Sequence, residues 1–306
     1  MIITNHSKLP LAIERAVVND PYDSSGSDIS TTRLIAPPRI VALQKKHQNE
    51  IEEDVADRIW SLLGQSVHHI IERSAENTND ISEVRLFYKD DDITNGWTLS
   101  GQLDYLSSEG ELMDFKVTSA WSALDAMTKG KDEWEEQLNV LNFLCRKNPD
   151  KINNIFVNNM FILAILRDWS KLKVMQSDNY PKKQVVKIPI RLWSEEEQEH
   201  FIRERILLHQ KANADAKADA KADSVGLIKC TPKEMWRKED VFAVMKDGRK
   251  SALRLLPTME KAKQYLKDNN MVENKGCCIV HRLGENVRCN HYCSVNKFCD
   301  QFTSDN

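Results

Sequence analysis

Two carboxylates and a lysine stand close together in one short stretch of the chain. Residues 101–116 contain Gly101, Asp104, Asp114 and Lys116, with a polar break at residues 107–110. On both sides of the break apolar and polar residues alternate, which predicts two paired strands joined by a hairpin turn. Asp114 and Lys116 are two residues apart and should share one face of their strand, and Asp104 can reach that face from the partner strand.

This combination of side chains suits metal-dependent chemistry. Carboxylate oxygens are ligands that Mg²⁺ and Mn²⁺ prefer, and a lysine beside them can orient a water molecule and offset developing negative charge. The reaction that we expect is hydrolysis of a phosphodiester bond. The alternative is that Asp104 and Asp114 flank an ordinary turn and that Lys116 is a solvated charge at a sheet edge.

A histidine on a predicted helix can join this group. From Ile40 to Ile71 apolar residues recur at helical spacing, and His68 lies one turn after Gly64, a residue that would let a neighbouring element approach closely. Neutral imidazole is a capable metal ligand, although a lone histidine is more often a hydrogen-bonded residue of the core or surface. Glu83, in the next predicted strand, is a further acid near the site, but solvation is its simpler interpretation.

Three of the seven cysteines lie within eleven residues of one another; they are Cys289, Cys293 and Cys299. In a reducing compartment, thiols this close are more often metal ligands than core residues. A fourth ligand is needed, and we choose Cys230, at the start of the same segment. His291 is an alternative that could complete a zinc site. The other three cysteines are interpreted as packing residues.

Composition bounds the class of protein. The chain has 306 residues, of which 41% are hydrophobic and 29% charged, as in ordinary soluble globular proteins. No stretch approaches the roughly 18 to 20 apolar residues of a membrane span, and residues 1–10 lack a signal-peptide pattern, so we expect a cytoplasmic protein without membrane contact. A net charge of −3 excludes a uniformly basic nucleic-acid binder, so DNA contacts must use local patches.

The pattern along the chain predicts four segments. They are an N-terminal arm (1–39), a catalytic core (40–212), an alanine, lysine and aspartate tract that forms a linker or a helical extension (213–227), and a small C-terminal module (228–306). In the module, strands at 241–245 and 251–256 flank Asp247-Gly248, which predicts a two-residue type I′ turn. A helix at 260–269 then completes a ββα unit.

Together these residues resemble the RecB-like branch of the PD-(D/E)XK nucleases, in particular phage-type exonucleases with a C-terminal cysteine cluster. The matching stretches follow the family's order and are residues 64–68, 101–104 and 114–116, then Gln137 on the next helix. The family's glutamine motif usually continues to a tyrosine, where this chain has Leu141. The cysteine triplet resembles that of iron–sulfur nucleases of AddAB type and of CRISPR adaptation nucleases, in which the lone cysteine usually precedes the core, whereas Cys230 follows it.

The resemblance implies an α/β (α+β) fold of restriction-endonuclease type, with a mixed central sheet flanked by helices and a small C-terminal metal-binding module. It also implies a catalytic set, which is His68, Asp104, Asp114, Lys116 and Gln137. In this set the histidine and the two aspartates would hold Mg²⁺ or Mn²⁺, with the Val117 carbonyl as a further ligand. Lys116 would act with the bound water, and Gln137 would position the substrate or Lys116. The four cysteines would hold a structural [4Fe–4S] cluster, or alternatively Zn²⁺.

The implied function is a metal-dependent DNA nuclease, expected to be an exonuclease of recombination, replication or repair. Its partners would be DNA and a recombination or replication protein, in the host cytoplasm if the chain is phage-encoded. Two alternatives stay open. One is a catalytically inactive DNA-binding or assembly protein on the same fold, and the other is a metal-stabilised interaction module whose C-terminal unit is the working part.

Overall fold

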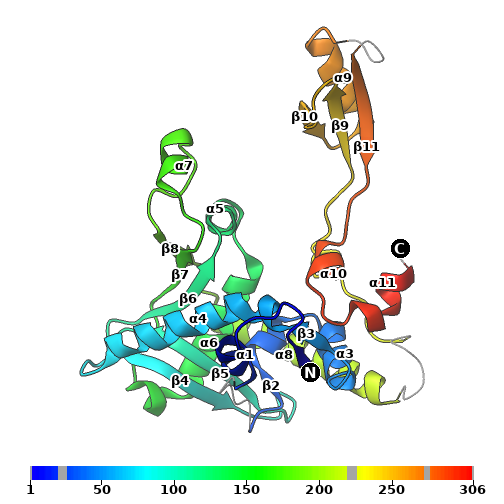
Figure 1. The fold of residues 1–306 in the computed structure, drawn as a ribbon. Helices are drawn as coiled ribbons and strands as arrows, with labels where there is room; N and C mark the ends of the chain where they lie inside the picture. The colour runs from blue at the N-terminus through cyan, green and yellow to red at the C-terminus, as the bar shows by residue number, and fades with distance from the viewer. Residues whose placement is uncertain (1, 20–25, 219–225, 272–275, 305–306) are drawn as a thin grey trace. The chain divides into compact units, whose positions relative to one another are not determined.

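The computed structural model describes residues 2–19, 26–218, 226–271 and 276–304, which belong to two compact units, residues 1–220 and 221–306 (Figure 1). The boundary falls within the predicted low-complexity tract. The first residues of that tract are a helical extension, because helix α8 runs from Glu195 to Ala218. Residues 219–225 of the tract lie outside the described ranges. No helix in the described ranges is long and apolar enough to cross a membrane.

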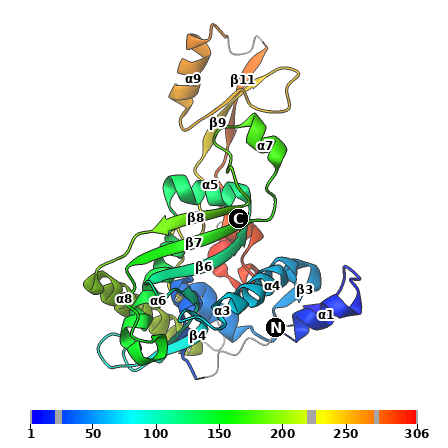
Figure 2. The ribbon, with the colours of Figure 1, turned by 90° about the vertical axis from the view of Figure 1, so that its left-hand side faces the viewer.

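A mixed six-stranded sheet forms the centre of the first unit. Its strands are β2 (Ile29–Ser30), β4 (Ile81–Tyr88), β5 (Leu99–Leu106), β6 (Glu111–Thr118), β7 (Asn159–Leu166) and β8 (Val185–Ile190). The order is β2-β5-β6-β7-β8, and β4 also pairs with β5. The β2–β5 and β6–β7 pairs are parallel and the others antiparallel, and Figure 2 shows β6, β7 and β8 side by side.

Helices pack against this sheet, chiefly α4 and α6, which confirms the prediction of a mixed sheet flanked by helices. The α-helices of the first unit are α1 (Leu11–Val18), α2 (Thr31–Ile35), α3 (Pro38–Lys46), α4 (Ile59–Glu72), α5 (Ala120–Lys129), α6 (Asp132–Lys147), α7 (Lys171–Gln176) and α8. Short 3₁₀ turns are η1 (Val55–Arg58), η2 (Arg73–Ala75) and η3 (Pro149–Ile152). Ser194 and Glu197 exchange the two hydrogen bonds of a capping box at the start of α8.

The predicted hairpin is confirmed, and its two strands separate where the site begins. β4 pairs along one edge of β5. On the other edge, β2 pairs with residues 99 and 100 and β6 with residues 105 and 106. Residues 101–104, which carry the first acidic motif, therefore lie between two partner strands. This opening in the sheet gives side chains from the neighbouring helices room to approach.

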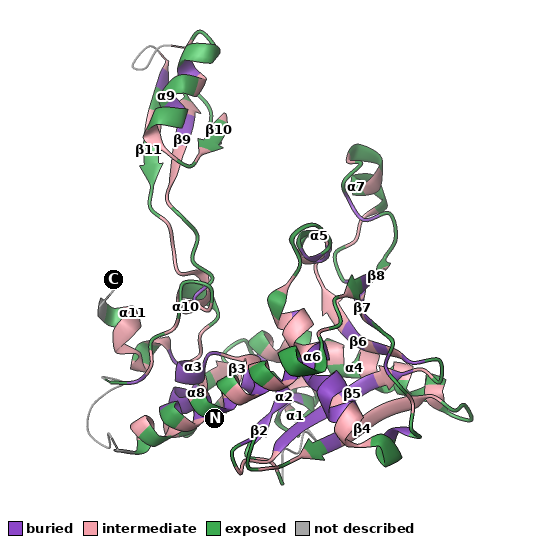
Figure 3. Ribbon diagram, turned by 180° about the vertical axis from the view of Figure 1, so that it is seen from behind, coloured by how far each residue is buried: buried purple, intermediate pink, exposed green. Residues whose placement is uncertain are grey.

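Close packing holds this opening in place. Figure 3 shows buried residues along β5, whose Leu99 and Leu103 are fully buried in the main core. At Gly101 an added Cβ would lie 2.5–2.7 Å from Thr31 Oγ1 and from the methyl groups of Leu141 and Leu144. Only glycine allows α2 and α6 to approach the strand this closely.

Two predictions for the N-terminal part are wrong. Residues 1–39 are not merely an arm packed against the core, because β2 joins the main sheet and Leu34 is fully buried in its core. A strand of two residues is too short to show a period in the sequence. Helical spacing also continues through β3 (Glu52–Asp54) and η1, where the chain is not α-helical. There, β1 (Ile2–Thr4) pairs with β3 in parallel.

The second unit contains a three-stranded antiparallel sheet with the order β10-β9-β11. Its elements are β9 (Val241–Lys246), β10 (Arg254–Leu256), α9 (Met259–Asp268), β11 (Cys277–Arg282), α10 (Val287–His291), η4 (Asn296–Phe298) and α11 (Asp300–Ser304). The prediction of a two-residue turn is wrong, because residues 247–253 form a longer connection between β9 and β10. Cys277 is buried and Cys278 exposed, as expected for neighbours on a strand.

Candidate metal centre

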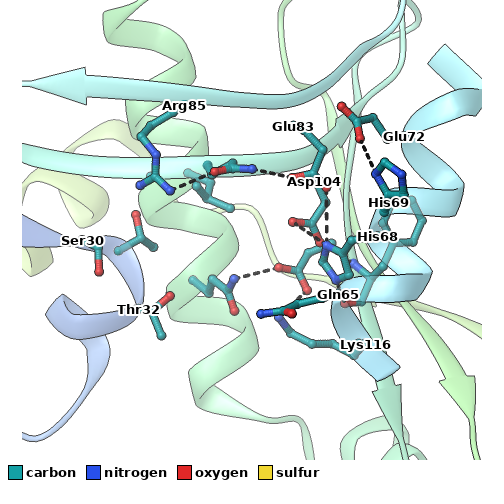
Figure 4. A pocket seen from close by; sticks show the side chains of 18 of the residues that line it. Ser30, Thr32, Gln65, His68, His69, Glu72, Glu83, Arg85, Asp104 and Lys116 are labelled. Carbon is teal, nitrogen blue, oxygen red and sulfur yellow. Dashed lines mark hydrogen bonds and ion pairs between the residues drawn. The ribbon is translucent and has the colours of Figure 1, made fainter. Parts of the chain in front are cut away.

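A cavity of about 1060 Å³ in the first unit brings together the five predicted catalytic residues, which are His68, Asp104, Asp114, Lys116 and Gln137. They come from α4, from the β5–β6 hairpin and from α6, three parts of the chain that are separate in the sequence. Figure 4 shows the labelled members pointing toward one another. Gly64 also lines the cavity. The close approach predicted at Gly64 is not found, because no atom lies within 4 Å of the place where its Cβ would be.

His68 reaches the site from α4 and is oriented by the backbone of β6. Its Nε2 lies 3.0 Å from the carbonyl oxygen of Phe115. Because a carbonyl can only accept a hydrogen bond, Nε2 carries the proton of this contact. The other ring nitrogen, Nδ1, lies 3.5 Å from carboxylate oxygens of both Glu83 and Asp104. The ring therefore presents Nδ1 to the acids.

Asp104 occupies the point at which β5 and β6 part. Strand pairing ends at Tyr105 and Met113, and just beyond that pair the Phe115 amide donates to Asp104 Oδ2 at 2.8 Å. The side chain thus replaces a backbone acceptor, and the carboxylate is buried. Its Oδ1 remains directed at His68.

Asp114 is the most buried acid of the site, at 1% exposure, and both of its oxygens have protein partners. Gln137 Nε2 donates to Oδ1 at 2.7 Å, and Lys116 Nζ lies 2.7 Å from Oδ2. The predicted neighbourhood of Asp114 and Lys116 on one strand face is therefore confirmed. Gln137 contacts the carboxylate rather than Lys116.

Burial and charge together shift the protonation of the site. Burial, with the nearby Asp114 charge, raises the pKa of Asp104 to about 7. A hydrogen bond to Glu83 raises the pKa of His68 to about 9, against the effect of burial and with help from the Asp104 charge. Burial opposes the charge of Lys116, but the carboxylates of Asp114 and Asp104 outweigh it and raise its pKa. His68 and Lys116 thus favour their charged forms beside the acids of the cavity.

Glu83 belongs to the site, and its interpretation as a solvated residue is wrong. Its side chain is 19% exposed, and Oε2 accepts a hydrogen bond from Gln102 Nε2 at 2.5 Å. The strand register could have placed Glu83 in the site from the sequence. Once residues 83–88 are paired with the first hairpin strand in antiparallel fashion, Glu83 falls opposite Asp104.

The donor set fits a hard divalent cation. Ligand atoms of His68, Glu83 and Asp104 all lie within 4.8 Å of one another. Carboxylate oxygens with one imidazole suit Mg²⁺ or Mn²⁺ better than a soft metal. Val117, whose carbonyl was expected to be a further ligand, lines the cavity. However, the carbonyl that contacts His68 is that of Phe115, a residue that the sequence reasoning missed.

The four cysteines predicted as ligands lie in the second unit. Burial raises the pKa of the Cys293 thiol, and the neighbouring Cys289 and Cys299 raise it further. Cys230 exchanges two backbone hydrogen bonds of 2.9 Å with the side chain of Gln301, two residues after Cys299. In the described ranges, their sulfur atoms do not form a group as compact as the one around His68.

The alternative ligand in the second unit, His291, faces another group. Its Nε2 lies 3.6 Å from a carboxylate oxygen of Glu285, and its side chain is 57% exposed.

Comparisons with known protein families and with curated proteins give no match. Among solved structures, the chain is similar to the one described as "Crystal structure of SSO0001". The two are 14% identical with a TM-score of 0.43, and the similar part covers 65% of this chain and 84% of that one. At this level the similarity assigns neither a family nor an activity.

Proposed function

We propose that this protein is a divalent-metal-dependent DNA nuclease with a restriction-endonuclease-like core. The observation that supports this most strongly is the convergence of His68, Asp104, Asp114, Lys116 and Gln137 on one cavity. These residues come from separate segments, and a chance set would have no reason to meet. A catalytically inactive descendant would likewise have no chemical reason to keep a buried acid paired with a lysine.

Each side chain has a role in phosphodiester hydrolysis. Mg²⁺ or Mn²⁺, held by His68 and the neighbouring acids, would polarise the phosphate and lower the pKa of the attacking water. Lys116, fixed 2.7 Å from Asp114, orients that water and offsets the negative charge that develops on the phosphate. Gln137 keeps the Asp114 carboxylate in one orientation through its hydrogen bond.

The cysteines have a structural role in this proposal. Cys230, Cys289, Cys293 and Cys299 hold a [4Fe–4S] cluster, or alternatively Zn²⁺, that fixes the end of the chain. The hydrogen bonds between Cys230 and Gln301 support the choice of Cys230, because they hold it beside the segment that carries Cys299. We assign the protein exonuclease action on linear DNA, in recombination, replication or repair.

The test is degradation of end-labelled linear DNA by protein prepared without air, with Mn²⁺ present. We expect wild type to release labelled nucleotides, Asp114→Asn to lose this activity by about 10²-fold or more, and EDTA to abolish it. Asp125→Asn is the matched control, because Asp125 is exposed and paired with Lys129 on the surface. Intact circular DNA would support exonuclease action. If wild type leaves linear, circular and single-stranded DNA intact, the nuclease proposal fails and a binding protein on the same fold replaces it.

A further inference from the structure

Glu83 has an unusual backbone for a strand residue. Its φ is +53°, in the left-handed region that residues other than glycine rarely adopt. Holding a residue there costs free energy and requires that the surroundings determine the conformation. The strand register stays unchanged on both sides, with Ser82 opposite Tyr105 and Val84 opposite Leu103. The distortion therefore changes the direction of one side chain and leaves the strand register intact.

The Glu83 side chain has one fixed oxygen and one that faces the cavity. Oε2 accepts from Gln102 Nε2 at 2.5 Å, and Gln102 Oε1 accepts from Arg85 Nη2 at 2.8 Å. Because Arg85 can only donate, it sets which way the Gln102 amide is turned, and so directs its NH₂ group to Glu83. Oε1 is then left 3.5 Å from His68 Nδ1 (Figure 4).

The His68 ring is prepared in a matching way. Metal-binding histidines commonly donate their second ring N–H to a backbone carbonyl, which fixes the tautomer and the ring orientation. Here the Phe115 carbonyl takes that place at Nε2. Nδ1 is then the nitrogen turned toward Glu83 and Asp104, the two acids with an oxygen on this side. Asp114 differs, because Lys116 and Gln137 hold both of its oxygens.

We propose that Glu83 is a direct protein ligand of the divalent metal, beside Asp104 and Nδ1 of His68. Gln102 and Arg85 are positioning residues that orient the Glu83 carboxylate. This inference rests on the proposed function, since it concerns the metal of that same site. It departs from the set expected from sequence, which had no acid from β4 and named the Val117 carbonyl as a further ligand.

The test measures Mn²⁺ binding to the full-length protein without DNA. The readout is the electron paramagnetic resonance signal of free Mn²⁺, which falls as the ion binds. We expect Glu83→Gln to weaken binding at least tenfold, because it removes a charged ligand while keeping the size and the contact with Gln102. Gln102→Ala should weaken binding about tenfold through the lost orientation. Glu72→Gln is the matched control, since Glu72 lines the same cavity but pairs with His69, and its affinity should stay within about twofold of wild type.

The outcomes separate this inference from the proposed function. If Glu83→Gln binds Mn²⁺ as wild type does while Asp104→Asn does not, Glu83 is no ligand and the metal site stands. If wild type itself binds no Mn²⁺, the metal site and the Glu83 assignment both fail. Circular dichroism melting of each variant shows whether it folds. If Glu83→Gln melts at a lower temperature than wild type, Glu83→Asp replaces it, because aspartate keeps the charge but has a shorter side chain. Glu83→Asp should bind Mn²⁺ more weakly than wild type. Equal binding would overturn the assignment.

Discussion

The two metal-binding regions proposed for this protein differ in what holds their side chains in place. Around His68 and Asp114, each chemical group has a hydrogen-bond or ion-pair partner on a long element of the main sheet or its helices. The cysteines instead lie on or beside α10 and α11, helices of five residues each. Helices this short are marginal by themselves. The first region is therefore formed before a metal binds, whereas the second should need its metal to keep its shape.

The largest expected effect is the loss of the cysteine metal. Cys293→Ser should remove its binding, and since structural metals contribute on the order of 10 kcal/mol, the C-terminal segment should lose its fold. Limited proteolysis with mass spectrometry should then show cleavage between residues 226 and 304, while residues 26–218 stay protected. Iron–sulfur clusters absorb visible light at about 400 nm, and Zn²⁺ does not. Absorption of the wild type in this range would therefore assign iron–sulfur rather than zinc.

Cys278→Ser is the control for this comparison, because Cys278 is exposed on β11. It should leave the protease pattern unchanged. Equal cleavage in both variants, or none in either, would contradict the view that the second region depends on a metal.

Proton release should accompany metal binding in the first region. His68, with a pKa of about 9, and Asp104, with a pKa of about 7, must both lose their protons to bind a cation. Affinity for Mn²⁺ should therefore rise with pH, about tenfold per unit between pH 7 and 9 and more steeply below pH 7. Calorimetry in buffers of different ionisation enthalpy counts the protons released. An affinity that does not change from pH 6 to 8 would contradict this assignment.

The packing that shapes the first region can be tested by two glycine substitutions. Gly101→Ala should lower the free energy of unfolding by about 1–3 kcal/mol, because its Cβ would overlap Thr31, Leu141 and Leu144. Gly64→Ala should instead raise it by up to about 1 kcal/mol, since Gly64 lies in α4 with open space around it. Urea unfolding measures both. A stable Gly101→Ala protein would mean that the opening between β2 and β6 is not set by close packing.

The central hairpin could be predicted from sequence because its signals are local. Alternation with period two located β5 and β6, and the spacing of Asp114 and Lys116 placed them on one strand face. Long-range features were harder. The two-residue strand β2 carries no period, and Glu83 reaches the site only through the register of β4 against β5. The positive φ of Glu83 could not be predicted either, because glycine and asparagine, and not glutamate, usually occupy such positions.

The most direct test of the account is the rate of DNA hydrolysis by Lys116→Met at saturating Mn²⁺. Lys116 contacts Asp114 inside the cavity, whereas Lys129 pairs with Asp125 at the surface, so Lys129→Met is the matched control. The account predicts a loss of about 10²- to 10³-fold for Lys116→Met and an unchanged rate for Lys129→Met. Equal hydrolysis by both variants would contradict the claim that this cavity is a nuclease active site.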